Sequence, residues 1–351
     1  MENYLPTLRK LSKVSKVTPE IITDFFMKEH QQNVDIKWID KCYGSYEIKV
    51  GTYKFLITEI PISSLNRKWG RVTNLQNKMV ALKIPTPLYL GQGLMDKDIF
   101  NILKGSEPLT TSNKWLFDVF SLEVAIAYFR NYFIKSDCLS NYKAILFEAI
   151  EAFYLGYDHI AIMSLFPVFE GGLRNLQNKI LGTNSSIVKA DLFDKGIRQM
   201  IIKWGEKNCG GYDWYPGKDI HQEVQIDFFT HLNNQCDVMN ATLIFFTKVL
   251  YLSSDNISDE EKHSFNRHVI IHLLKSNFEE PSNFIRVFLA LTHLTFMESL
   301  YNEEVPFFWN GINENDKIIS HYIRSKMDRD FTERRDSLTS FGIDLYHRSS
   351  K

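Results

Sequence analysis

Apolar side chains recur every three to four residues through most of the chain beyond residue 111, and this spacing constrains the fold more than any other feature. The main runs are 116–133, 142–156, 159–181, 186–204 and 223–252. Such a stripe lies along one side of an α-helix and requires another element to cover it. We therefore expect residues 111–351 to form a helical domain, with the run 159–181 interrupted near Pro167 and Gly171.

Residues 1–110 follow a different pattern. The first 30 residues are typical of helices, and Pro19 suits a first helical turn. From 34 to 60, three segments rich in β-branched and aromatic residues alternate, with Gly44 and Gly51 where turns would fall, so we expect an antiparallel meander. Residues 78–90 suggest a further strand, which two prolines confine to a sheet edge or a loop. The expected fold is mainly α, with a smaller α+β N-terminal domain before a C-terminal helical bundle.

Composition excludes several classes of protein. Hydrophobic residues make up 44% and charged residues 24% of 351, as in globular chains of two domains. No apolar stretch is long enough to span a membrane, and lysines and arginines interrupt the first 20 residues where a signal peptide would need an apolar region. The four cysteines are scattered, so neither a disulfide framework nor a zinc site is expected, which fits a cytoplasmic protein.

Positive charge is concentrated toward the N-terminus. Residues 1–85 hold 14 Lys and Arg against 8 Asp and Glu, a balance of +6, whereas the rest holds 27 against 34, a balance of −7. A basic surface of this kind can bind a phosphate backbone. The alternative is an ordinary solvated surface, because a modest imbalance is weak evidence for nucleic-acid binding.

The segment 263–274 carries the residues with the clearest chemical potential. Ser258 and Glu261 would form a capping box before it. On a helix with Arg267 at 0°, His268 falls at about 100° and His272 at about 140°, so the three share one arc. The apolar residues on the other side would face a core: Val269, Ile270, Leu273 and Leu274.

An arginine and a histidine on one arc suit metal-free cleavage of RNA. A neutral imidazole can accept the proton of a ribose 2′-OH, since histidine titrates near neutral pH. A guanidinium can bind two phosphate oxygens and stabilise the charge that develops on them. A second histidine is needed as general acid, and two chains related by a twofold axis would supply it.

This segment resembles the HEPN superfamily of helical domains, many of which are metal-independent RNases in toxin–antitoxin, abortive-infection and CRISPR systems. The family signature is Arg, four to six residues, then His, and it matches Arg267 to His272 here, with the form NRHxxxH from Asn266. Glu170 and Arg174 match an upstream family helix with an acidic and then a basic residue. The resemblance covers roughly 140–302. Leu273 follows the final histidine, where many relatives have glycine.

The resemblance implies an up-and-down bundle of four or five helices that forms a homodimer. Arg267 would bind and stabilise the scissile phosphate, and His272 would act as general base or acid. His268 and Asn266 would orient or bind the RNA, and Glu170 would anchor Arg267. The products would carry a 2′,3′-cyclic phosphate and a 5′-OH. We expect a cytoplasmic endoribonuclease in antiviral defence or toxin function, with RNA and a neutralising antitoxin or defence protein as partners and with no cofactor or membrane.

Other interpretations stay open. The Arg267–His272 pair could be structural, and the protein could be a non-catalytic dimeric module that binds RNA or a partner protein. His268 and His272 have the spacing of a zinc-binding pair, but Val269 stands where a metalloprotease has glutamate. Glu170 with Arg174 could be an ordinary ion pair.

Two further residues are expected to be structural. His293 lies within an apolar helix that would begin with Ser282 as N-cap, and we expect a core histidine that makes hydrogen bonds. Cys209 precedes two glycines, and a turn is favoured over a reactive thiol.

Overall fold

A computed structural model describes residues 4–64, 70–186, 190–251, 265 and 280–341. Most of these residues are helical, and one small antiparallel sheet lies near the N-terminus, so the predicted mainly α fold with an α+β N-terminal part is confirmed. Within the described part of the chain, no helix combines the length and the apolar character needed to cross a membrane.

The elements follow one another along the chain as follows. The N-terminal part holds α1 (Leu5–Leu11), α2 (Pro19–His30), β1 (Asp35–Ile39), β2 (Ser45–Val50), β3 (Tyr53–Thr58) and η1 (Ile62–Ser64). There follow α3 (Val72–Met79), η2 (Val80–Leu82), α4 (Gln92–Lys104), α5 (Pro108–Val119), α6 (Leu122–Asn131), η3 (Phe133–Lys135), η4 (Ser140–Tyr142), α7 (Lys143–Tyr154) and α8 (Asp158–Leu181). The last are α9 (Ala190–Cys209), α10 (Gln222–Leu232), α11 (Asn234–Phe245), the π-helical turn η5 (Phe246–Leu250), α13 (Ser282–Ser299) and α14 (Glu314–Thr339).

The chain forms two compact units, and each is built from separated parts of the sequence. Unit 1 comprises residues 1–73 and 195–240, and unit 2 comprises 74–194 and 241–351. This division differs from the expected boundary at residue 110, because α10 packs its apolar side chains into the core of the N-terminal sheet.

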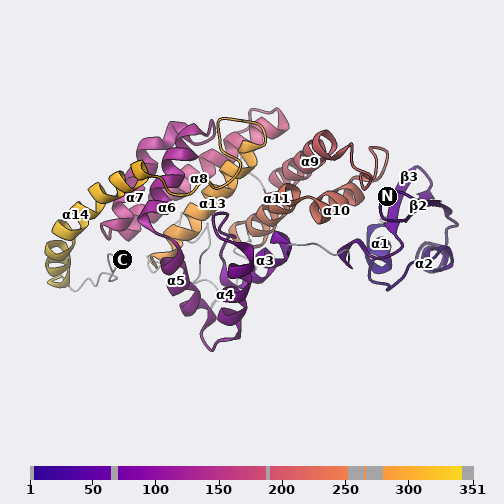
Figure 1. The fold of residues 1–351 in the computed structure, drawn as a ribbon, viewed down its shortest axis with the longest axis horizontal. Helices are drawn as coiled ribbons and strands as arrows, with labels where there is room; N and C mark the ends of the chain where they lie inside the picture. The colour runs from indigo at the N-terminus through magenta and orange to yellow at the C-terminus, as the bar shows by residue number, and fades with distance from the viewer. Residues whose placement is uncertain (1–3, 65–69, 187–189, 252–264, 266–279, 342–351) are drawn as a thin grey trace. The chain divides into compact units, whose positions relative to one another are not determined.

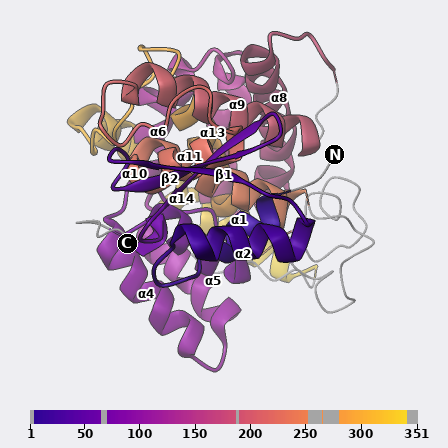
Figure 2. The same cartoon turned by 90° about the vertical axis from the view of Figure 1, so that its right-hand side faces the viewer.

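The sheet of unit 1 is the expected meander, with strand order β1-β2-β3 and antiparallel pairing. Ile36, Ile48 and Phe55 lie opposite one another across the three strands, and the last two are fully buried. Figure 2 shows α1 and α2 beside the sheet, and their side chains share its hydrophobic core. Gly44 and Gly51 have positive φ angles of 69° and 58° in the two turns, as their positions predicted.

The start of α2 also follows the sequence prediction. Pro19 occupies the first turn, and the Thr18 hydroxyl accepts a hydrogen bond from the backbone N–H of Ile21. A proline at this position gives up no helical hydrogen bond, and a threonine N-cap satisfies one of the unpaired amides.

Unit 2 is organised around α13, which is buried along its whole length. Figure 1 shows α7, α8 and α13 side by side, and α8 contacts both of the others. α13 begins at Ser282, so the prediction that Ser282 is the N-cap was wrong by one position. Its hydroxyl instead accepts a hydrogen bond from the buried Arg286 guanidinium at 2.6 Å.

The expected interruption of the helix over 159–181 was wrong, because α8 continues without a break. Pro167 lies on its exposed side, where water can satisfy the carbonyl that loses its partner. Gly171 and Gly172 are buried, and a Cβ atom at these positions would collide with Tyr142 and Leu139 respectively. The glycines therefore allow a close approach between α8 and the segment before α7.

Two further segments, 116–133 and 84–90, differ from the expected helix and edge strand. The expected single helix over 116–133 is two helices, since the Ser121 hydroxyl accepts from the Val124 N–H and starts α6 anew. Residues 84–90 form a loop rather than an edge strand. The buried Gln76 side chain holds this loop, because its amide donates to the Ile84 carbonyl and accepts from the Thr86 N–H.

Candidate functional site

The predicted catalytic arc lies outside the described residues. This applies to Asn266, Arg267, His268 and His272, and their roles therefore stay predictions. Glu170 is described and lies half-buried on α8.

One described residue connects the predicted arc to α8. Phe265, two residues before Arg267, is only 4% exposed, and its ring centroid lies 5.9 Å from that of Phe166 on α8. Phe166 is four residues before Glu170, which corresponds to about one helical turn. Arg174 lies one turn beyond Glu170 and is also half-buried. The segment that carries the predicted arc thus starts from a hydrophobic contact close to the acidic and basic pair on α8.

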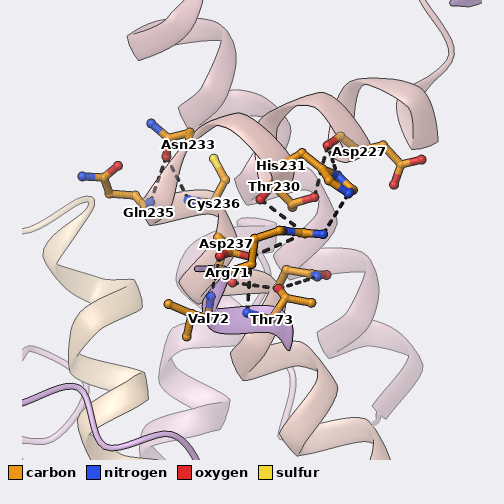
Figure 3. A network of polar contacts seen from close by, with 11 residues as sticks. Arg71, Val72, Thr73, Asp227, Thr230, His231, Asn233, Gln235, Cys236 and Asp237 are labelled. Carbon is orange, nitrogen blue, oxygen red and sulfur yellow. Dashed lines mark hydrogen bonds and ion pairs between the residues drawn. The ribbon is translucent and has the colours of Figure 1, made fainter. Parts of the chain in front are cut away.

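A second concentration of polar side chains lies in unit 1, where α10 and α11 meet the start of α3 (Figure 3). Arg71 Nη1 lies 2.8 Å from His231 Nε2, and Arg71 Nη2 lies 3.5 Å from Asp237 Oδ1. The Arg71 side chain is 15% exposed and that of Asp237 is 1% exposed. The ion pair is therefore largely shielded from water, which strengthens it relative to a surface pair.

The hydrogen-bond partners determine the tautomer of His231. A guanidinium has no acceptor, so Nε2 of the imidazole must carry the lone pair that accepts from Arg71. Nδ1 then carries the hydrogen and donates to the backbone carbonyl of Asp227 at 2.7 Å. His231 is consequently neutral in this arrangement.

Two residues of the same network hold helix ends together. Asp237 accepts from the backbone N–H groups of Val72 at 2.7 Å and Thr73 at 3.4 Å, and so caps the N-terminus of α3 from another part of the chain. Asn233 accepts from the N–H groups of Gln235 and Cys236 and caps α11. These contacts are typical of structural capping, and they fix the positions of Arg71 and His231.

A cavity of about 70 Å³ lies in unit 1 between α1, β3, η1 and α10. Its lining is mainly apolar, with Arg9, Glu223 and Asp227 among its charged residues. Asp227 is exposed to solvent on one side but lines the cavity on the other, and desolvation there, with Glu223 beside it, raises the pKa of its carboxyl to about 6. The volume suits about two water molecules and is too small for most substrates.

The described residues offer no metal site and no activated thiol. No group of three or more His, Cys, Asp and Glu side chains in the described part could hold a metal ion. All four cysteines are free and buried, as the absence of a disulfide pattern predicted. Burial raises the pKa of the Cys209 thiol, which keeps it protonated, as expected for a structural cysteine.

Sequence reasoning missed the network around Arg71. Its members lie about 160 residues apart in the chain, and no local pattern links them. The Asn233–Asn234 pair before α11 was the available signal, because asparagine is common at N-caps.

His293 has the role that the sequence predicted. It is fully buried, its Nδ1 lies 2.6 Å from the Thr242 hydroxyl, and its Nε2 lies 2.8 Å from the Thr86 carbonyl. No protein-family model, curated protein or solved structure matches this chain.

Proposed function

We propose that the protein is a metal-independent endoribonuclease that cleaves RNA at a homodimer cleft with Arg267 and His272. The observation that carries the proposal is the Arg267-to-His272 string two residues after Phe265, whose ring packs against Phe166 of α8, one helical turn before Glu170. The proposal includes a role in antiviral defence or as a toxin, with a neutralising antitoxin or defence protein as partner.

Chain geometry makes a contact between Arg267 and Glu170 feasible. One residue, Asn266, lies between Phe265 and Arg267, so their Cα atoms are at most about 7 Å apart. Phe166, the partner of Phe265, is about one helical turn from Glu170. In the proposal, the Glu170 carboxylate would orient the planar donors of Arg267.

The chemistry follows from the two residue types. Arg267 would bind the non-bridging oxygens of the scissile phosphate and stabilise the charge that develops on them. His272 of one subunit would take the 2′-OH proton, and His272 of the other would protonate the leaving 5′ oxygen. His268 and Asn266 would position the RNA. The four free, buried thiols agree with a reducing compartment such as the cytoplasm.

The test is incubation of the purified chain with end-labelled RNA in EDTA. We expect cleavage that survives chelation. Arg267→Ala and His272→Ala should each lower the rate at least about 100-fold, the usual size of an electrostatic contribution for the first and of an acid–base contribution for the second. Arg267→Lys keeps the positive charge but loses the paired, planar N–H donors of the guanidinium, so it should cleave faster than Arg267→Ala and more slowly than the wild type.

A matched control separates chemistry from folding. His321 is exposed on α14, and His321→Ala should cleave at the wild-type rate. Binding of RNA without cleavage would support the non-catalytic binding module instead. Cleavage that EDTA abolishes, with stoichiometric zinc by elemental analysis, would support the zinc-dependent alternative and overturn the proposal.

A further inference from the structure

The contact between Arg71 and His231 can exist in only one protonation state of the imidazole. Nε2 of His231 accepts from Arg71 Nη1 at 2.8 Å, and Nδ1 donates to the Asp227 carbonyl at 2.7 Å. Protonation would place an N–H group on Nε2, so that two donors of two cations would face each other. The contact would then change from an attraction to a repulsion.

We propose that His231 is a proton-sensitive latch that holds Arg71, and with it the start of α3, only while its imidazole is neutral. Imidazole changes charge between about pH 5 and 8, so the latch would respond to acidification within the physiological range. Neither the sequence pattern nor the proposed nuclease chemistry includes this element.

The latch acts on a defined piece of backbone. Arg71 immediately precedes α3, and the Asp237 carboxylate holds the N–H groups of Val72 and Thr73. Arg71 also pairs with that same carboxylate and donates to the Thr230 carbonyl at 3.4 Å. Displacement of the guanidinium by a protonated His231 would therefore disturb the group that caps α3 (Figure 3).

The charges around His231 oppose one another. The carboxylate of Asp237 on α11 and the C-terminal end of α10 favour an imidazolium. Arg71 disfavours it. Further charged groups surround Asp227, whose carbonyl accepts from the ring: Glu223 on α10, Arg198 on α9 and Arg9 on α1. Because Arg71 contacts Nε2 directly, the imidazolium is favoured once the guanidinium has moved away, so proton binding would open the latch.

Hydrogen exchange of the full chain tests the latch. Protection of the amides in 70–79 would be measured at pH 7.5 and 5.5, with correction for the intrinsic exchange rate. We expect protection in the wild type to fall by up to about tenfold between the two pH values. At pH 5.5, about one unit below the ordinary pKa of a histidine, proton binding can shift the closed–open equilibrium of the latch by up to about that factor. His231→Gln can accept from Arg71 and donate to the Asp227 carbonyl at both pH values, so its protection should change less than twofold.

Asp227 needs its own control, because its carboxyl titrates in the same range, with a pKa of about 6. Asp227→Asn keeps the backbone carbonyl that accepts from His231 and should keep the wild-type pH response. If the response disappears in Asp227→Asn, or is equally large in His231→Gln, the latch is overturned.

A measurement on the wild type covers the case in which a variant fails to fold. Imidazole ¹⁵N NMR at pH 7.5 should show His231 as the tautomer with hydrogen on Nδ1. Hydrogen on Nε2 would exclude the contact with Arg71 and overturn the proposal.

Discussion

His231 in unit 1 and His293 in unit 2 both use both ring nitrogens, yet they differ in burial and in the charge of their partners. His231 is partly exposed and lies between a cation and a carbonyl. His293 is fully buried between the neutral Thr242 hydroxyl and the Thr86 carbonyl. Burial lowers the pKa of His293 to about 4, against the small effect of its hydrogen bond to Thr86.

The comparison shows that two satisfied ring nitrogens do not define a role. Burial away from charge keeps His293 neutral throughout the physiological range, so it acts as a fixed part of the core. The ring of His231 is partly exposed and contacts a guanidinium, and the partner that it would lose on protonation is Arg71. A functional histidine is thus recognised by the charge and exposure of its surroundings rather than by its hydrogen-bond count.

The largest expected effect on stability is that of replacing His293. His293→Leu leaves the Thr86 carbonyl and the Thr242 hydroxyl buried without their partner, and we expect a loss of about 2–5 kcal/mol in the free energy of unfolding. Urea unfolding at pH 7.5 would measure it. His231→Ala, the matched change in unit 1, should cost at most about 1 kcal/mol, and equal losses would contradict the contrast between the two histidines.

Acidification should produce the next largest effect. The pKa of His293 is lower in the folded protein than the ordinary value of 6.5, so its contribution to stability is complete above pH 6.5 and is lost as pH falls toward 4. The whole change amounts to roughly 3 kcal/mol. Urea midpoints at pH 7, 5.5 and 4.5 should fall less steeply in His293→Gln than in the wild type, and parallel profiles would argue against a buried neutral imidazole.

The two arginines extend the comparison to cations. Arg286 is buried among neutral oxygens of Ser282, Asn113 and Leu82, and burial lowers its pKa to about 10. Arg286→Met should cost about 1–3 kcal/mol, because it removes the donors on which these buried oxygens depend. The loss should hardly change between pH 5.5 and 7.5.

Arg71 should behave differently, since the proposed latch makes its contact with His231 depend on pH. We expect Arg71→Ala to destabilise unit 1 by about 1–2 kcal/mol at pH 7.5 and by clearly less at pH 5.5, where protonation of His231 would already weaken the contact in the wild type. The smallest effect is that of His231→Gln at pH 7.5, which should stay within about 0.5 kcal/mol of the wild type. A cost for Arg71→Ala that does not depend on pH would leave no role for His231.

Local patterns were sufficient for much of the fold. The meander over 34–60, the start of α2 at Pro19 and the core position of His293 were all predictable, because each depends on alternation, helical period or a turn residue nearby in sequence. The break between α5 and α6 was missed because the apolar run continues on both sides of Ser121, the residue that caps the start of α6.

Contacts between distant segments were not predictable. Gln76 holds the loop after it through side-chain hydrogen bonds that no periodicity signals. Arg71 and His231 are 160 residues apart in the chain, and beside their contact Asp237 accepts from the first amide of α3. At the predicted catalytic arc, the sequence supplied the residue types, and the described structure adds the contact of Phe265 with α8.

The most direct measurement of the proposed reaction compares two substrates of identical sequence in EDTA, one RNA and one with 2′-O-methyl groups throughout. We expect the wild-type protein to cleave only the first and to leave 2′,3′-cyclic phosphate ends, because the ribose hydroxyl is the proposed nucleophile. Cleavage of both substrates, or products that carry a 5′-phosphate, would contradict the proposed reaction.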